Sequence, residues 1–247
     1  MYSKIPMPHF ELNDEDARFA IAYLPLVGGV IALIVYCALR VLYRADLPVF
    51  VTTMIITAIP LILTGGFHAD GYLDTKDAIG SYLPIEKKLE ILKDPHTGAA
   101  AVTGYAVCIL LFMSGIGVIA DSHKASVTMA SVFVISRALS SITSQCFQKA
   151  RHDGMLAAET KGGSRARLVI PVVFLVIALA AAASESVVYT GVIVVVFTVF
   201  ALFYKRMTIR EFGGVTGDTA GYFVVAGQTV AIDAIALTIL VMSRLGG

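Results

Sequence analysis

The chain has 247 residues, of which 57% are hydrophobic and only 15% charged, and its mean hydropathy is +0.80. A soluble domain carries about 25% charged residues, so this composition excludes a water-soluble globule. The net charge of +1 lacks the strongly basic character of a nucleic-acid binder, and no nucleic-acid partner is expected.

Apolar runs of about 17 to 25 residues recur along the chain, the length that a helix needs to cross the hydrocarbon of a lipid bilayer. They predict an all-α polytopic membrane protein with about seven transmembrane helices, forming a single integral membrane domain over residues 1–247. The expected spans lie near 24–43, 47–64, 99–120, 126–147, 168–184, 187–204 and 219–243. Only the segment 184–186 separates the fifth span from the sixth, so a count of six spans is the alternative.

An odd number of spans places the termini on opposite sides of the membrane. The loops at 1–23, 65–98, 148–167 and 205–218 fall on one side and hold most of the 19 basic residues. By the positive-inside rule these loops are cytoplasmic. The sequence therefore predicts a multi-pass protein of the cell (inner) membrane, with its chemically rich loops facing the cytoplasm.

The loop that follows the second span contains a row of carboxylates. Asp70, Asp74 and Asp77 stand at i, i+4 and i+7, so they share one face if this stretch is helical. Stacked like charges repel, and a divalent cation would make the row tolerable. Hard oxygen ligands without a nearby cysteine favour magnesium or manganese over zinc. The alternative is a solvated acidic helix face.

A short amphipathic helix is expected at about 84–94, with Pro84 in its first turn and apolar residues on one side. Lys87, Glu90 and Asp94 fall on the other side. This polar face would turn towards the aspartates from a position in the membrane interface. The alternative is an ordinary surface helix with a Lys87–Glu90 ion pair.

A later stretch repeats the spacing of the first motif. Gly213, Gly214 and Asp218 stand in the same Gly-Gly-x-x-x-Asp arrangement as Gly65, Gly66 and Asp70. Paired glycines allow backbone amides to approach an anion, and an adjoining helix start favours phosphate. A shared role of both stretches in one site is expected.

Two charged residues lie deep within expected spans, Arg137 in the fourth and Asp233 in the seventh. Each costs about 2.5–3.5 kcal/mol on insertion scales, so each is expected to face the protein interior. They either neutralise each other, or Arg137 points into a cavity that receives an anionic group of a substrate.

Four segments together resemble one known family. They read GGFHADGYLDTKDAIG at 65–80, EKKLEILKDPHTGA at 86–99, SRA at 136–138 and GGVTGDTAGY at 213–222. The chain resembles the cobalamin synthases, which are adenosylcobinamide-GDP ribazoletransferases, and the resemblance extends over essentially its whole length. It departs from the family pattern at Ala78, His96 and Gln228.

The resemblance implies a transferase of a late step in cobalamin biosynthesis. Such an enzyme joins adenosylcobinamide-GDP to alpha-ribazole or its 5′-phosphate, releases GMP and requires Mg²⁺. Homo-oligomers, or association with other enzymes of cobalamin assembly, are further expectations. The implied metal ligands are Asp70, Asp74, Asp77 and Glu90. The candidates for the group that takes the proton of the attacking hydroxyl are Asp94 and His68. The implied substrate-binding residues are Gly65, Gly66, Lys76, Lys93, Arg137, Gly214 and Asp218.

Two alternatives remain from other functional classes. A CDP-alcohol phosphatidyltransferase also uses spaced aspartates at a membrane surface, but its pattern has an Ala-Arg pair that is missing after Asp70-Gly71. A secondary transporter would use the carboxylates as cation sites, but transporters usually place such charges near the middle of the membrane.

Overall fold

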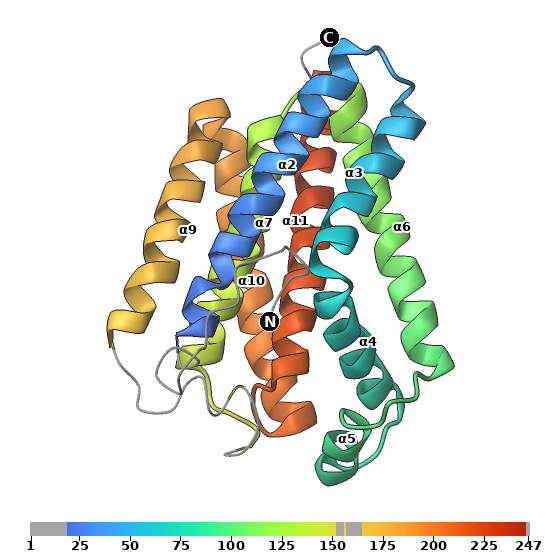
Figure 1. Cartoon of the computed structure of the whole chain (residues 1–247), viewed down its shortest axis with the longest axis vertical. Helices are drawn as coiled ribbons and strands as arrows, with labels where there is room; N and C mark the ends of the chain where they lie inside the picture. Colours follow the sequence, from blue (N-terminus) through green and yellow to red (C-terminus); the bar gives the residue numbers. More distant parts are fainter. Residues whose placement is uncertain (1–18, 152–155, 157–164, 246–247) are drawn as a thin grey trace, which may run out of the picture.

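A computed structural model describes residues 19–151, 156 and 165–245, and these form a bundle of helices (Figure 1). The 3-10 turn η1 and the α-helices have the following bounds: η1 Ala20–Tyr23, α2 Leu24–Arg44, α3 Val49–Thr64, α4 Phe67–Gly80, α5 Ile85–Ile91, α6 Ala99–Ser122, α7 Ser126–Cys146, α9 Arg165–Glu185, α10 Val187–Phe212 and α11 Gly217–Leu245. Much of the predicted cytoplasmic loops at 1–23 and 148–167 lies outside the described residues.

The predicted membrane protein is confirmed. Six of the described helices are long and apolar enough to cross a membrane, and the count rises to seven if α3 and α4 together form one bent span. The connection from α4 to α6, the start of α9 and the turn between α10 and α11 lie at one end of the bundle (Figure 1). The short connections α2–α3, α6–α7 and α9–α10 lie at the other end, as the predicted alternation of spans requires.

The second predicted span, 47–64, corresponds to α3, but the chain continues beyond it in a way that the sequence did not predict. Helix α3 has only 16 residues and ends at Gly65, whose φ of 61° is left-handed. Gly66, at φ 83°, continues the break, and α4 leaves at a bend of 90°. Glycine tolerates this backbone because it has no Cβ. The acidic stretch is helical, which was the condition for its aspartates to share one face, and it packs against α6 and α11 instead of lying in an open loop.

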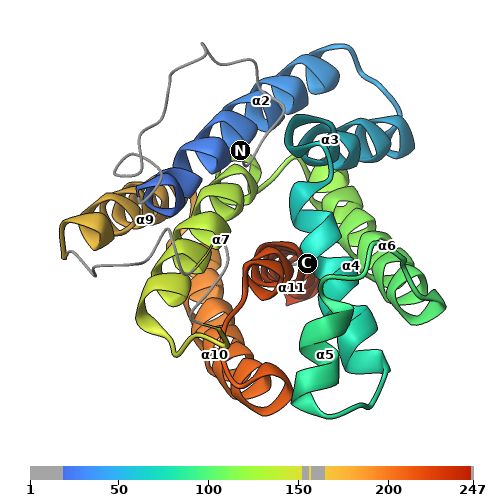
Figure 2. The same ribbon diagram turned by 60° about the horizontal axis from the view of Figure 1, so that its bottom comes forward.

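The helices divide into an outer ring and a buried centre. Figure 2 shows α11 surrounded by the other helices. In the most apolar 18-residue stretch of each helix, 83% of the residues of α7 and 61% of those of α11 are buried, against 17% of those of α9. Exposed apolar side chains on the outer helices suit contact with lipid, because the membrane itself solvates them. The polar residues near α11 and α7 are therefore shielded from lipid.

Candidate active site

The site begins with a close contact between α4 and α11. A Cβ atom added to Gly71 would lie 2.7 Å from the carbonyl oxygen of Asp218, and one added to Gly221 would lie 3.1 Å from the carbonyl oxygen of His68. Gly71 therefore leaves no room for a side chain, and a side chain at Gly221 would require the backbones to move apart by a few tenths of an ångström. The motif of the second span and the motif before the last span are neighbours in space, as the repeated spacing predicted.

This contact brings three carboxylates together. Asp74 interacts electrostatically with Asp70, Asp218 and Asp77, in decreasing order, and Asp218 interacts with Asp70. Asp70 lies in the first turn of α4, and Asp218 lies in the first turn of α11. The positive ends of two helix dipoles therefore lie beside these acidic groups, which favours negative charge there. We call Asp70, Asp74 and Asp218 the acidic cluster.

The start of α11 is fixed by a reciprocal cap. The Thr216 hydroxyl accepts from the Thr219 backbone N–H at 3.1 Å, and the Thr219 hydroxyl accepts from the Thr216 backbone N–H at 2.9 Å. This arrangement is equivalent to a capping box, in which two otherwise unpaired N–H groups are satisfied by side chains. It sets the position at which Asp218 enters the helix.

Asp77 and Lys76 face α6 instead of the centre of the acidic cluster. The Asp77 carboxylate lies against Gly98, where an added Cβ would meet Oδ1 at 2.0 Å. The Lys76 side chain runs along α6, and its Cε would be 2.8 Å from a Cβ on Gly104. Gly104 of α6 and Gly98 at its N-cap thus make room for polar side chains of α4.

The described residues contain no group of three or more His, Cys, Asp or Glu side chains arranged to hold a metal ion. The acidic cluster is nevertheless built from hard oxygen donors without sulfur, the chemistry that Mg²⁺ prefers. The mutual repulsion within the cluster also decreases when a cation binds. The donor type of Asp70, Asp74 and Asp218 is therefore the one that Mg²⁺ prefers, although the described residues do not arrange three of these carboxylates as ligands of one ion.

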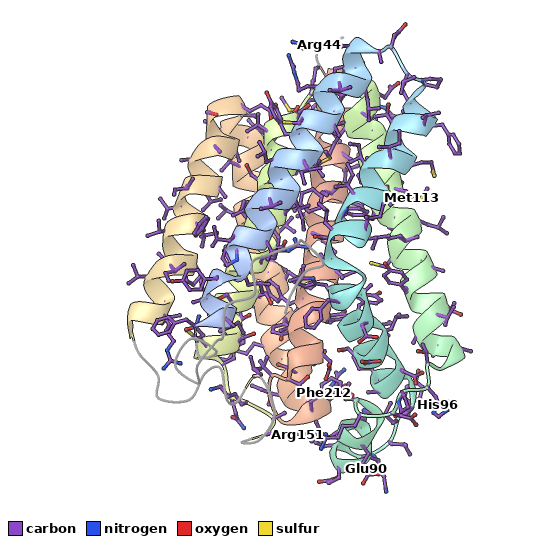
Figure 3. The ribbon with its side chains drawn as sticks, in the orientation of Figure 1. Arg44, Glu90, His96, Met113, Arg151 and Phe212 are labelled. Atoms are coloured by element: carbon purple, nitrogen blue, oxygen red, sulfur yellow. The ribbon has the colours of Figure 1, made fainter. Side chains whose placement is uncertain are left out.

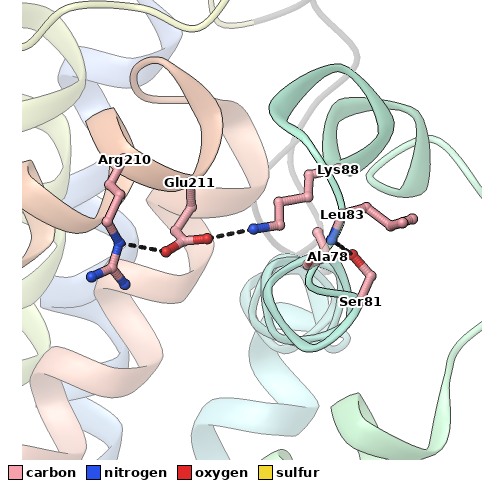
Figure 4. Close-up of polar contacts among 6 residues, drawn as sticks. All are labelled: Ala78, Ser81, Leu83, Lys88, Arg210 and Glu211. Atoms are coloured by element: carbon pink, nitrogen blue, oxygen red, sulfur yellow. Dashed lines mark hydrogen bonds and ion pairs between the residues drawn. The ribbon is translucent and has the colours of Figure 1, made fainter.

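Helix α5 is attached to the bundle by a buried ion pair. Lys88 Nζ donates to Glu211 Oε2 at 2.5 Å, and Arg210 Nε donates to Glu211 Oε1 at 2.6 Å (Figure 4). The side chains of Lys88 and Glu211 are 9% and 12% exposed. The sequence pattern had placed Lys87 and Glu90 at the functional face, whereas the residue that anchors the helix is Lys88.

The remaining predicted residues of this segment lie on the surface. Glu90 pairs with Lys87 at 2.8 Å with both side chains largely exposed, which is the ion pair of the alternative interpretation. Asp94 accepts from the backbone N–H of His96 and contacts its ring, and these bonds hold the pKa of the Asp94 carboxyl below its usual value. Lys93 is exposed. Figure 3 shows Glu90 and His96 at the lower end of the molecule.

His68 of α4 and Arg137 of α7 lie in the interior, on the side of α4 that faces away from the acidic cluster. They are 4% and 1% exposed and line a cavity together with Gln228 and Tyr105. None of the aspartates lines this cavity. Residues two apart on a helix point in nearly opposite directions, so His68 faces away from Asp70. The geometry does not place His68 to take a proton from a group bound at the acidic cluster.

Comparison with known proteins places this site in a family. A family model described as cobalamin-5-phosphate synthase matches residues 1–236. The chain belongs to this family. A relative from Lachnoclostridium phytofermentans, named adenosylcobinamide-GDP ribazoletransferase, is 36% identical over 94% of this chain and 88% of its own length. No solved structure matches the chain.

More distant members carry the same name. The relative from Geobacillus sp. (strain WCH70) is 30% identical over 88% of this chain and 84% of its own. One from Clostridium perfringens (strain SM101) is 27% identical, with 94% and 92% covered. Four segments suggested the cobalamin synthases in the sequence, and they lie in α4, in and after α5, in α7 and at the start of α11. Helix α11 packs against both α4 and α7, and α5 contacts α4.

The paired glycines of the cobalamin-5-phosphate synthase motifs have backbone roles. Gly65 and Gly213 end α3 and α10 in the left-handed conformation, so each pair begins as a helix C-terminal signal. Gly214 lies against another backbone segment, because its Cβ would meet the Gln148 carbonyl oxygen at 2.5 Å. The sequence interpretation of these glycines as anion contacts remains a prediction, whereas their role in ending helices is visible.

Arg151 is a site residue that the sequence did not identify. Its guanidinium donates to the Leu89 carbonyl oxygen of α5 and interacts electrostatically with Asp218 of the acidic cluster. Figure 3 shows it at the lower end of the bundle, near α10 and α11. It was one basic residue among several in a basic loop, and only the folded arrangement distinguishes it from its neighbours.

Proposed function

We propose that this protein is an adenosylcobinamide-GDP ribazoletransferase, which joins adenosylcobinamide-GDP to alpha-ribazole or its 5′-phosphate and releases GMP. The names of the relatives support the reaction. The observation that carries the proposal is the meeting of Asp70 and Asp74 with Asp218 at the starts of two helices. Transfer of a phosphate-linked group to a hydroxyl depends mainly on positioning and charge neutralisation, and this arrangement is suited to both.

Asp70, Asp74 and Asp218 would hold Mg²⁺, which supplies positive charge to a pyrophosphate when it is bound. The starts of α4 and α11 add favourable dipoles for the phosphate oxygens. Arg151, beside Asp218, would contact a phosphate group on the side of α5. Asp94 remains the candidate base, because its carboxylate is exposed on the connection between α5 and α6.

The proposed location is the cytoplasmic membrane, with the acidic cluster facing the cytoplasm. The turn before α11, a helix with Asp218 in its first turn, and the connection from α4 to α6, which holds Lys87, Lys88 and Lys93, lie at the same end of the bundle (Figure 1). By the positive-inside rule that end is cytoplasmic. A nucleotide-linked substrate would then reach the site from the compartment in which nucleotides are made.

The test is GMP release from adenosylcobinamide-GDP, alpha-ribazole and Mg²⁺ by membranes that contain the protein. Asp74→Asn should abolish release, because it removes a central charge of the acidic cluster with little change in shape. Asp121→Asn, at the far end of α6, is the matched control and should retain activity. If wild-type membranes release no GMP from this mixture, the proposed activity is wrong. Full activity of Asp74→Asn would remove the acidic cluster from the reaction.

A further inference from the structure

A small cavity, lined mainly by apolar side chains with a few polar groups among them, lies between α3, α4, α6, α7 and α11. The volume in which the centre of a water-sized sphere can move is about 20 Å³. One such sphere needs about 10–15 Å³, so the cavity holds one or two small particles. A phosphate group, with oxygens on all sides of phosphorus, is too large. The predicted role of Arg137 in receiving a substrate phosphate is therefore not accommodated by this cavity as it stands.

The cavity is lined by polar atoms that have no partner. Both ring nitrogens of His68, Nε of Arg137 and Oε1 of Gln228 are buried without a hydrogen bond to the described residues. These side chains are 4%, 1% and 7% exposed. Buried polar atoms in proteins are paired in the great majority of cases, so several unpaired atoms at one cavity indicate a bound particle.

The charge of Arg137 identifies the kind of particle. The guanidinium donates through Nη1 to the Phe133 carbonyl oxygen at 3.0 Å, and among the described residues no carboxylate forms an ion pair with it. Asp233, the other deep charge, lies against Gly115 of α6 instead, where a Cβ would meet its Oδ1 at 2.5 Å. The mutual neutralisation of Arg137 and Asp233 that the sequence left open is therefore not observed.

A buried guanidinium stays charged, and an isolated buried charge is costly. A water molecule in the cavity would satisfy hydrogen bonds but leave this charge without a counterion. A small anion would supply both. Donors are present for it in Arg137 Nε–H and in one ring N–H of His68, and the Gln228 amide presents N–H groups if its oxygen and nitrogen exchange places.

We propose that this cavity binds one halide-sized monovalent anion, which acts as the counterion of Arg137. Chloride fits the size and the charge. The ion joins α4, through His68, to α7 and α11, through Arg137 and Gln228. It thereby helps to hold the two helices that carry the acidic cluster. The inference rests on the cavity alone and does not depend on the proposed reaction.

The first test uses thermal unfolding of the purified protein in detergent, followed by loss of helical circular dichroism. Chloride, bromide and gluconate salts are compared at equal ionic strength, since ionic strength alone alters surface electrostatics. Halide at about a hundred times its Kd should raise the midpoint by roughly 5–10 °C in a chain of this size. Chloride and bromide should produce a saturable rise and gluconate should not. Equal midpoints in all three salts would overturn the proposal.

The second test places the counter-charge on the protein. Gln228→Glu introduces a carboxylate into the cavity without changing side-chain size, so this variant should unfold at the same temperature with and without halide. Gln145→Glu, on α7 but outside the cavity, adds the same charge and should keep the halide response. A Gln228→Glu protein that responds to chloride like the wild type would refute the site.

A third measurement locates the ion directly. Crystals grown with bromide should give an anomalous peak between Arg137 and His68. A peak elsewhere, with none in the cavity, would show that the halide effect arises at another site and would overturn the assignment.

Discussion

The contact between Gly71 and Asp218 leads to a quantitative prediction for Gly71→Ala. The new Cβ would lie 2.7 Å from the Asp218 carbonyl oxygen and 3.1 Å from its Cα. Ordinary contact begins at 3.4 Å, so the nearer distance is too short by 0.7 Å. Both opposing atoms belong to the backbone and cannot turn aside. The two helices must therefore separate by about 0.5–1 Å, the scale at which overpacking costs about 1–3 kcal/mol.

The same displacement should affect turnover more than stability. It moves Asp70 and Asp74 relative to Asp218, and a misplacement of about 1 Å at a reacting centre can cost about 10²-fold in rate. We expect GMP release by Gly71→Ala to fall by one to two orders of magnitude. The midpoint of thermal unfolding should fall by only a few degrees, since alanine also favours the helix by up to about 1 kcal/mol over glycine.

Gly191→Ala is the matched control, because a Cβ added at Gly191 on α10 meets nothing within 4 Å. This variant should keep full activity and unfold at the wild-type temperature or slightly above it. Wild-type turnover by Gly71→Ala would refute the argument that α4 and α11 must touch for the acidic cluster to work. Equal losses in both variants would attribute the effect to helix composition instead.

Three further predictions concern the buried ion pair, the acidic cluster and the orientation in the membrane. Glu211→Ala should lower the free energy of unfolding by about 3–5 kcal/mol, because it leaves Lys88 buried without a partner. Lys88→Ala should cost less in the same unfolding assay, since Arg210 still neutralises Glu211. Asp70→Ala and Asp218→Ala should each reduce GMP release by orders of magnitude, and their double mutant should lose much less than the product of both effects, because residues acting as a unit are non-additive; multiplicative losses would mean that they act separately. In intact cells a membrane-impermeant thiol reagent should label cysteine at 124 and spare cysteine at 82, both in exposed positions at opposite ends of the bundle; the reverse pattern would contradict the orientation.

The spans were predictable because a helix in lipid must be apolar over a fixed length, whatever its partners. The predicted 99–120 corresponds to α6, and the break near 186 separates α9 from α10. The upper half of the second span, α3, was predicted as 47–64. Its continuation into α4 was not predicted, because the aspartates and lysine of α4 lower the hydropathy of any window that contains them. Only burial among neighbouring helices makes so polar a segment compatible with the bundle.

The candidate site was partly predictable for a similar reason. The helical spacing of Asp70 and Asp74 and the repeated Gly-Gly-x-x-x-Asp pattern are local features, and they identified the acidic cluster. The partners of Lys88 and Arg151 lie far away in the chain, so no local pattern indicates them. The same is true of the His68 cavity, which exists only because five helices surround it.

The break at Gly65 and Gly66 connects these observations. A straight continuation of α3 would carry the following residues through the bundle along the same axis, whereas the 90° bend directs α4 across the start of α11. Asp70 and Asp74 thereby reach Asp218, while the opposite face of the same helix presents His68 to the closed cavity. One bent span thus separates two environments: the acidic cluster, where we propose that a cation and a pyrophosphate bind, and the cavity beside His68, where we propose that a single anion binds. Restricting the bend, for example with Gly66→Ala at φ 83°, should therefore impair both GMP release and the halide dependence of unfolding. Loss of activity with an unchanged halide response in Gly66→Ala would show that the two environments do not depend on a common backbone.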